Sequence, residues 1–490
     1  MMMGGEFQLP EPIIQHIQSF LTGKEAAQTT VLSKSWYSAW LTRTNLELTD
    51  YYFNTTGGYY YAGFNYGFSE FAKKTIQRYE ESNLTIQRLR LYMCGSTSMV
   101  DLASELIVRA LKLGVTHLNL MIDYSKIFVL PHEVLECENL VELSLAFCEI
   151  DRNSIKCLNL ESLRMFAVGI SRDTIYNIIS RCPLIQEMEL SCIHETQREN
   201  GEIGPRAPCP TDIPKLCQLK CLVLRNVEFD TLWCFSDLLP KFPSLLDLTL
   251  GNCKNVQKVC SPSLERLTFD PSHRSRVEFD VPSIKKFTLK RSSIGRSVIP
   301  LVCFKSTSSK YWESHVSIKS YDPLNTSLFL ELNQLINELS QSKIYLSLDF
   351  GSRDSFDYEV GDFEGLPKPQ VENVTVDIED LPSLNCYALF DGLFWLCRPR
   401  FITQSLLPES YRCAKEHNDF VCKTLVQGLK GTCSFQSLYK SGLRDLEEVN
   451  VEIYDDAVPA WKPLPLESLL DASKCLTEEQ KIRFQLNWNL

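Results

Sequence analysis

The sequence predicts an α/β chain in which a short helical module precedes a long array of strand and helix units. Three observations predict this fold class. Apolar residues follow helical spacing between residues 7 and 40, a short strand pattern of the form Leu-x-Leu then recurs, and helix-like segments separate several of those strands. With 490 residues, the chain is long enough for a large core or two domains.

Residues 7–40 carry start signals for three helices. A proline suits the first turn of the first helix, and Thr22 with Glu25 has the spacing of a capping box that opens the second. Ser33 can cap the third, which carries two tryptophans one turn apart. A helical trio this short buries too little to be stable alone, so its large apolar side chains predict a docking surface. The alternative is a helical cap on the domain that follows.

From residue 84 onwards a strand pattern repeats. Successive copies begin 19 to 34 residues apart, which clusters around the leucine-rich-repeat period of about 20 to 29 residues. The longest step contains a Gly/Pro segment, residues 199–214, that predicts a surface loop. In each copy we expect the outer two residues to be buried and the middle one to face outward. The copies are Leu89-Arg90-Leu91, Leu118-Asn119-Leu120, Leu143-Ser144-Leu145, Leu163-Arg164-Met165, Met188-Glu189-Leu190, Leu222-Val223-Leu224, Leu248-Thr249-Leu250, Leu267-Thr268-Phe269 and Phe287-Thr288-Leu289.

After residue 294 the period blurs, and the pattern predicts atypical late repeats followed by a terminal cap. Before residue 294, the segments between the strand patterns also carry helix signals, in particular from Ser98 to Gly114 and from Ser171 to Pro183. The late elements that we expect are helices at 328–339, 386–397 and 418–428, strands at 344–350, 371–378 and 446–453, and one short helix within 477–488.

Composition narrows the class of protein. The hydrophobic fraction of 44% and charged fraction of 23% are ordinary for a globular protein, and a net charge of -11 disfavours general binding to nucleic acid or anionic membranes. Residues 51–68 are rich in Tyr, Phe and Gly but contain no Lys or Arg, so we interpret them as a loop between modules rather than a stacking platform for single strands. No secretory signal or membrane span is visible.

The sequence offers little support for catalysis or metal binding. The seven histidines form no ligand pair, and no two of the 19 cysteines have Cys-x-x-Cys spacing. Without an export signal we expect reduced thiols. Cys94, Cys148 and Cys253 stand where the repeat consensus takes Asn or Cys, so we expect them to be core residues. No nucleophile elbow, Walker loop or dinucleotide fingerprint occurs, and we predict no cofactor and no enzyme activity.

The helical stretch resembles an F-box, particularly the plant type that precedes leucine-rich repeats. It departs from the family pattern at Glu11-Pro12, where Asp-Glu is usual, and at Ser35, where a basic residue is usual. The residues that carry the resemblance are Leu9-Pro10, Ile13, Ile17, Phe20-Leu21, Ala26-Ala27, Val31-Leu32-Ser33-Lys34, Trp36 and Trp40.

The resemblance implies docking to a Skp-type adaptor, which links an F-box to a cullin–RING ubiquitin ligase. The expected domains are an F-box (5–45), a connector and helix (46–83), leucine-rich repeats (84–300), atypical late repeats (301–405) and a C-terminal cap (406–490) that ends a solenoid, or horseshoe. The residues expected to contact the adaptor are Leu9, Pro10, Ile13, Ile17, Phe20, Leu21, Leu32 and Trp36.

The outward strand positions form a second candidate surface. Their charges weight the middle repeats towards negative and the later repeats towards positive, which favours a target protein of complementary polarity. An ordinary solvated repeat face, which also carries mixed charge, is the alternative. The candidate target-binding residues are Glu142, Arg164, Glu187, Glu189, Asp247, Arg266, Lys286 and Lys290.

By resemblance, the expected function is substrate recognition within an SCF-type E3 ubiquitin ligase, in the cytoplasm or nucleus, leading to ubiquitination and proteasomal degradation of a target protein. A ligase-independent scaffold made of the same repeats is the alternative. A small-molecule co-receptor would need a convergent basic pocket, of which the sequence shows no sign. The sequence does not identify the target.

Overall fold

The chain divides into two compact units, which are described separately. Unit 1 comprises Met1–Val227 with Pro240–Leu245, and unit 2 comprises Glu228–Leu239 with Leu246–Leu490. The computed structural model describes residues 9–51, 66–95, 98–124, 128–150, 155–170, 172–193, 215–227, 239–271, 276–291, 299–307, 312–320, 325–350, 363, 365–377, 383–404, 442–455, 459–465 and 482–489. No helix in this described part is long and apolar enough to cross a membrane.

The three helices predicted at the start of unit 1 are confirmed. The side chain of Thr22 accepts from the backbone N–H of Glu25, whose carboxylate accepts from the N–H of Thr22 at 2.9 Å, so the capping box is complete. Ser33 caps the third helix by accepting from the N–H of Trp36 at 3.4 Å. The elements are α1 (Glu11–Ser19), α2 (Gly23–Gln28), the 3-10 turn η1 (Thr29–Val31) and α3 (Lys34–Leu41).

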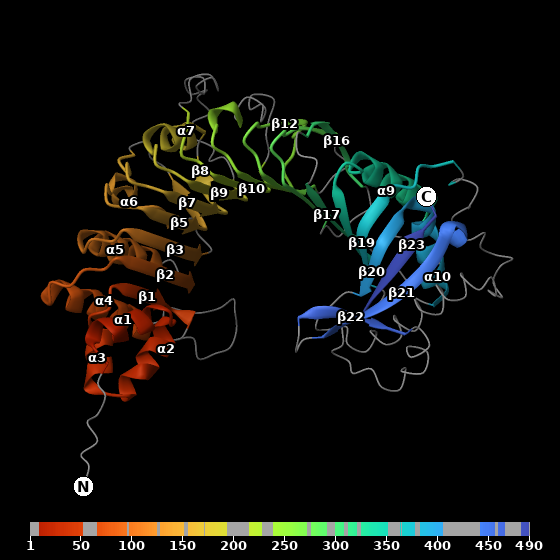
Figure 1. Ribbon diagram of the computed structural model, residues 1–490. Coiled ribbons are helices and arrows are strands. Elements are labelled where there is room, and N and C mark those ends of the chain that lie inside the picture. The colour runs from red at the N-terminus through yellow and green to blue at the C-terminus, as the bar shows by residue number, and fades with distance from the viewer. Residues whose placement is uncertain are drawn as a thin grey trace, which may run out of the picture. The chain divides into compact units, whose positions relative to one another are not determined.

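The main sheet of unit 1 follows the helical module in the chain, and its strands all run parallel to one another (Figure 1). It contains all six strand patterns predicted in this unit. Their Leu-type side chains, apart from the partly exposed Leu190, are buried on the face of the sheet that the helices cover. The strands, in spatial order, are β1 (Asn45–Thr49), β2 (Arg88–Gly95), β3 (His117–Tyr124), β5 (Glu142–Ala146), β7 (Ser162–Phe166), β9 (Glu187–Ser191) and β10 (Cys221–Arg225). The helices are α4 (Tyr66–Glu81), α5 (Ser98–Lys112), α6 (His132–Glu136) and α7 (Arg172–Arg181).

Strand β1 was not predicted from the sequence. Leu46-Glu47-Leu48 follows the same apolar alternation as the later copies, and β1 pairs in register with β2. A second small parallel sheet in unit 1 joins β4 (Phe128–Val129), β6 (Cys148–Ile150) and β8 (Gly169–Ile170).

Unit 2 begins with seven parallel strands and ends with antiparallel ones. Strand β23 pairs antiparallel with the last parallel strand, β20, so the C-terminal strands cover that edge of the sheet. The parallel strands are β11 (Asp247–Gly251), β13 (Arg266–Asp270), β15 (Lys286–Arg291), β17 (Glu313–Ser320), β18 (Lys343–Phe350), β19 (Gln370–Asp377) and β20 (Arg398–Gln404); then follow β23 (Ile482–Trp488), β21 (Leu446–Asp455) and β22 (Ala460–Leu464). The remaining elements are β12 (Lys258–Cys260), β14 (Arg276–Asp280), β16 (Leu301–Ser306), α9 (Thr326–Glu338), α10 (Ser383–Leu396) and η6 (Gly442–Asp445).

Most late elements match the prediction, with one correction. Helices α9 and α10 and strands β18, β19 and β21 are confirmed. The short helix expected within 477–488 is wrong for its second half, because residues 482–488 form β23. Buried Ile482, Phe484 and Leu486 alternate with less buried neighbours, which is a strand period. The predicted loop at 199–214 and helix at 418–428 lie outside the described residues.

The three cysteines predicted as core residues behave differently from one another. Cys148 is buried, Cys253 is partly exposed and Cys94 is exposed. The prediction for Cys94 is wrong because β2 continues to Gly95, so strand alternation carries Cys94 to the same side as the exposed Arg88 and Arg90.

Helix α10 is the most buried helix of unit 2 in the described part. Its residues 389–396 are all buried, and Gly392 lies directly against the ring of Phe329 from α9. A Cβ atom on Gly392 would lie 2.7 Å from Cζ of Phe329, closer than any real contact. The close approach of α10 to α9 therefore depends on this glycine.

Substitution Gly392→Ala is expected to destabilise unit 2 by about 1–3 kcal/mol, although alanine is the better helix former. The Phe329 ring is only 1% exposed, so it would have to shift within the core to admit the new methyl group. Thermal unfolding of the full chain measures the effect. Combining Gly392→Ala with Phe329→Leu should recover part of the loss, whereas a stabilised single variant would contradict the packing described here.

Candidate functional site: the amino-terminal helical module

The interior of the helical module is small and contains one polar residue. Ile14, Ala26 and Ala39 are buried, and Gln18 is 1% exposed. The Nε2 of Gln18 donates to Oγ1 of Thr29 at 2.9 Å and to the carbonyl oxygen of Trp36 at 3.2 Å. These two bonds satisfy the buried N–H groups of the amide and hold α1 against η1 and α3, whereas the buried Oε1 of Gln18 has no partner.

One side of the module packs on the strands and helix that follow. The guanidinium of Arg78 on α4 lies 5.5 Å from the ring centre of Trp40, and the hydroxyl of Tyr79 donates to the carbonyl oxygen of Arg43 at 2.7 Å. The N–H of Gly23 donates to the carboxylate of Glu47 on β1 at 2.8 Å. The module is thus fixed to unit 1 through α3 and the start of α2.

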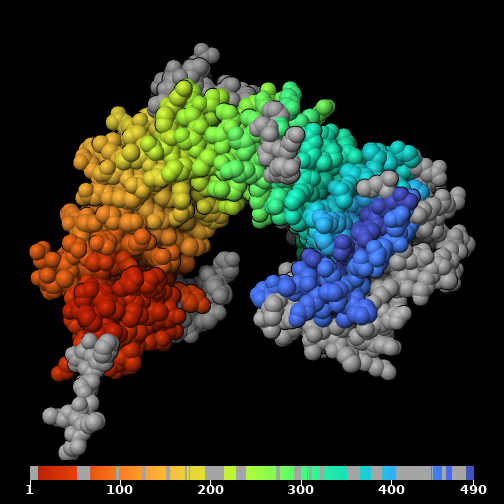
Figure 2. All heavy atoms as spheres, in the orientation of Figure 1, coloured from red at the N-terminus to blue at the C-terminus, as the bar shows by residue number. Residues whose placement is uncertain are grey.

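The rest of the module leaves large apolar side chains in solvent. Ile13, Ile17 and Phe20 lie at i, i+4 and i+7 of one helical face and are 47%, 36% and 76% exposed. Val31 and Leu32, at the end of η1, are 86% and 63% exposed. We call these five residues the apolar docking surface. Figure 2 shows the module (red) at one end of unit 1.

The predicted adaptor residues fall into two groups. Ile13, Ile17, Phe20 and Leu32 belong to the apolar docking surface, and Pro10 is also exposed. The half-buried residues of the predicted set are Leu9, Leu21 and Trp36. Val31 was not among the predicted contact residues, although it belongs to the same Val-Leu pair that carries the family resemblance.

On the sheet of unit 1, the predicted acidic residues are largely neutralised. Arg164 on β7 bridges Glu142 on β5 at 2.8 Å and Glu187 on β9 at 3.1 Å. Glu189 pairs with Arg225 on β10. The negative charge predicted for the middle repeats is therefore largely cancelled, because each of these carboxylates has a cation on a neighbouring strand.

In unit 2, Asp247 pairs with Arg266 at 2.8 Å. Lys286 and Lys290 on β15 are both exposed, and neither forms an ion pair within the described residues. Of the eight predicted target-binding residues, these two lysines are the ones whose charge stays available to a partner.

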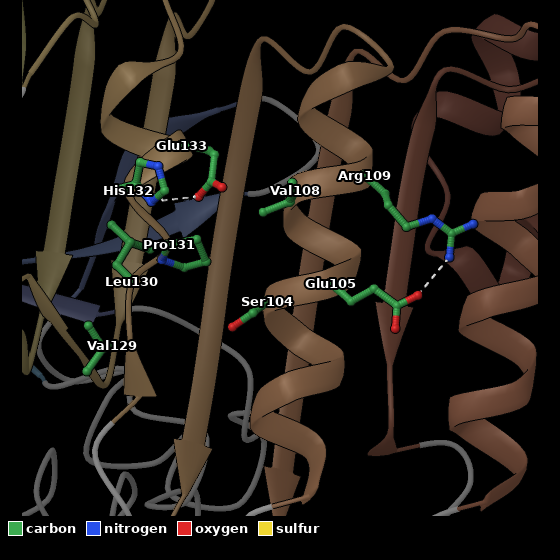
Figure 3. A pocket seen from close by; sticks show the side chains of 9 residues that line it. All are labelled: Ser104, Glu105, Val108, Arg109, Val129, Leu130, Pro131, His132 and Glu133. Atoms are coloured by element: carbon green, nitrogen blue, oxygen red, sulfur yellow. Dashed lines mark hydrogen bonds and ion pairs between the residues drawn. The ribbon is translucent and has the colours of Figure 1, made fainter.

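A hollow of about 580 Å³ lies in the helical layer of unit 1, between α5 and the segment 129–133 (Figure 3). Its charged side chains are paired within the fold. Arg109 bonds to Glu105 and Glu80, and His132 lies 3.2 Å from Glu133. Because its charged lining residues already pair with one another or with Glu80, none of them is left to orient a ligand, and we assign no function to this hollow.

Within the described residues, no group of three or more His, Cys, Asp or Glu side chains is placed to hold a metal ion. Burial raises the pKa of four cysteine thiols, Cys148, Cys157, Cys182 and Cys397, to about 12. These thiols stay protonated at neutral pH and are poor nucleophiles.

Iodoacetamide at pH 7.5 is expected to alkylate the exposed Cys217 in the folded chain and to leave those four thiols unmodified. A raised pKa keeps each thiol in its unreactive form over the neutral range, and burial blocks access as well. Peptide mass spectrometry measures the labelling, and labelling in denaturant provides the control. Rapid alkylation of Cys157 in the native chain would contradict this prediction.

Curated proteins from Arabidopsis thaliana are similar to part of the chain, whereas no family model matches it. An FBD-associated F-box protein is 31% identical over 191 residues, which cover 37% of this chain and 42% of the relative. An F-box/LRR-repeat protein is 28% identical over 194 residues (38% and 49%), and another is 30% identical over 192 residues (37% and 35%). The chain thus spans less than half the length of each of these relatives. Over this part of its length, the chain is therefore similar to plant F-box and F-box/LRR-repeat proteins, which supports a family of that kind.

Proposed function

We propose that this chain is the substrate-recognition subunit of an SCF-type E3 ubiquitin ligase, with residues 9–43 acting as an F-box and the parallel strands as a leucine-rich-repeat solenoid. The observation that carries the proposal is the apolar docking surface. Five large side chains remain exposed in a module whose other side already packs on β1 and α4. Exposed apolar patches of this kind mark protein interfaces.

The proposed partner at this surface is a Skp-type adaptor that recruits a cullin. Each well-buried anchor contributes about 1.5–3 kcal/mol. A stable interface needs roughly 1,000 Å² or more of buried surface, so the adaptor would also cover polar residues around these five anchors.

The chain acts by proximity rather than by breaking bonds. The F-box holds the adaptor, the strands hold a target protein, and the cullin-bound machinery transfers ubiquitin to a lysine of the target. The contribution of the chain is the high effective concentration of the target near that machinery. We place this activity in the cytoplasm or nucleus.

Affinity purification from plant cells under proteasome inhibition tests the proposal. The intact chain should recover a Skp-type adaptor, a cullin and ubiquitinated target, and a variant with Leu9→Ala and Pro10→Ala should recover less of the adaptor and cullin. Recovery of the adaptor without cullin would favour a ligase-independent scaffold. Failure to recover any adaptor would contradict the proposal.

A further inference from the structure

The outward face of the unit 1 sheet carries a row of apolar side chains at the carboxyl ends of its strands. Tyr92 on β2, Met121 on β3, Ala146 on β5 and Phe166 on β7 stand opposite one another in register. Met121 is 41% exposed and Phe166 is 47% exposed. These residues lie on the side of the sheet away from its buried leucines, so they contribute little to the core.

Phe147 extends this row beyond β5. Its ring meets that of Phe166 edge to face, with centroids 5.4 Å apart. Phe147 has a φ of 59°, a conformation that bulky residues rarely adopt. Other residues that directly follow strands of this sheet also have a positive φ. One of them is Asn226, and asparagine tolerates this conformation. Because Ala167 and Cys192 also have a positive φ, this conformation is a feature of the repeat, and the contact with Phe166 is what places the Phe147 ring in the row.

Two cations lie on β2, the strand at which this row begins. Arg88 and Arg90 on β2 are both exposed, and neither forms an ion pair within the described part of the chain. Glu47, the residue opposite Arg90, accepts instead from the N–H of Gly23. By contrast, the predicted acidic residues on this face, Glu142, Glu187 and Glu189, are paired with Arg164 or Arg225. The two guanidiniums on β2 are therefore exposed cations without an acidic partner among the described residues, and the exposed carboxylate of Asp123 lies two residues beyond Met121 on β3.

We infer that Arg88, Arg90, Met121, Phe147 and Phe166 form a docking site for an extended segment of a target protein, one with an acidic side chain followed by an apolar one. The free guanidiniums match carboxylates, which arginine binds bidentately, and the exposed apolar row matches the apolar side chain. This inference rests on the proposed function, since it assigns the target class to the receptor.

The sheet geometry sets the spacing of the two groups. Strands β2 and β7 are three steps apart in the sheet, which is about 14 Å at roughly 4.8 Å per step. An extended peptide that crosses the strands covers this distance in about four residues at about 3.4 Å each. The segment therefore carries its acidic residue about four positions from its apolar residue.

Selection of random dodecapeptides displayed on phage against the intact chain tests the inference. Enriched peptides should carry Asp or Glu about four residues from a Phe, Leu or Met. One synthetic, fluorescein-labelled peptide from the selection should lose at least about tenfold in affinity, by fluorescence anisotropy, for a chain with Arg88→Ser and Arg90→Ser, and likewise for Phe166→Ser. Raising the salt concentration should weaken its binding further.

The matched control carries Arg276→Ser and Leu330→Ser, which remove an exposed cation and an exposed apolar side chain from unit 2. This control should bind the peptide as the intact chain does. Enriched peptides without the acidic-to-apolar spacing, or affinity unchanged by the β2 and β7 substitutions, would overturn the inference. Because the assay contains no adaptor, either result leaves the ligase proposal to its own test.

Discussion

Replacing Asp445 with alanine is expected to lower the free energy of unfolding of unit 2 by about 3 kcal/mol. Arg398 is only 3% exposed, and its Nη2 donates to the carboxylate of Asp445. Its Nη1 donates to the carbonyl oxygen of Phe394, and its guanidinium lies 4.7 Å from the ring centre of Trp488. Removing Asp445 leaves the charge of Arg398 buried without its acidic partner.

The magnitude follows from the exposure of each partner. Loss of one member of a buried ion pair costs about 3–5 kcal/mol. The lower end applies here because the Asp445 side chain is 44% exposed, so water partly replaces the lost carboxylate.

Hydrogen exchange of the backbone amides in β20 and β23 measures this effect locally in the full chain. Asp445→Ala should accelerate exchange in both strands. The matched control is Glu372→Ala, which removes the partner of Arg400, a side chain that is 51% exposed. Surface pairs contribute about 0–1 kcal/mol, so the control should change little. Equal effects of the two substitutions would show that the buried pair does not hold the C-terminal strands.

Changing Ile17 and Leu32 together to aspartate is expected to lower the affinity for a Skp-type adaptor at least about 100-fold. Both side chains belong to the apolar docking surface and are 36% and 63% exposed. Each lost anchor costs about 1.5–3 kcal/mol of binding free energy, and a tenfold loss of affinity corresponds to about 1.4 kcal/mol. The loss of two anchors therefore weakens binding by at least about 100-fold. Because the side chains are exposed, the module should still fold.

Isothermal titration of purified adaptor into the full chain measures the loss, and far-UV circular dichroism checks the fold. The control carries Leu158→Asp and Leu184→Asp, which change two other exposed leucines of unit 1 that are 52% and 41% exposed. The control should bind the adaptor normally. If both pairs of substitutions reduced binding equally, the contact would not be specific to the helical module.

The helical module and the repeats could be predicted because their signals are local. The capping box of Thr22 and Glu25 and the cap at Ser33 depend on side chains that reach backbone groups three residues away. Each Leu-x-Leu copy likewise forms a strand because its alternation fits one buried face. All nine predicted copies are strands in the structure.

The surface properties of the sheet could not be predicted in the same way. Whether Glu142 is a free charge depends on Arg164, which stands on the next strand and 22 residues later in the sequence. The apolar row that contains Met121 and Phe166 emerges only once strand register is known. Cys94 was misplaced because the length of β2, and not the repeat consensus, decides which way its side chain points.

The central claim is that the exposed apolar side chains of the amino-terminal helices bind the adaptor. Hydrogen exchange of the full chain with and without a purified Skp-type adaptor tests it most directly. We predict slower exchange in α1, η1 and the start of α3 when the adaptor is present, with unchanged exchange in β3, β5 and β7. Protection of those strands alone, or no protection at all, would contradict the claim.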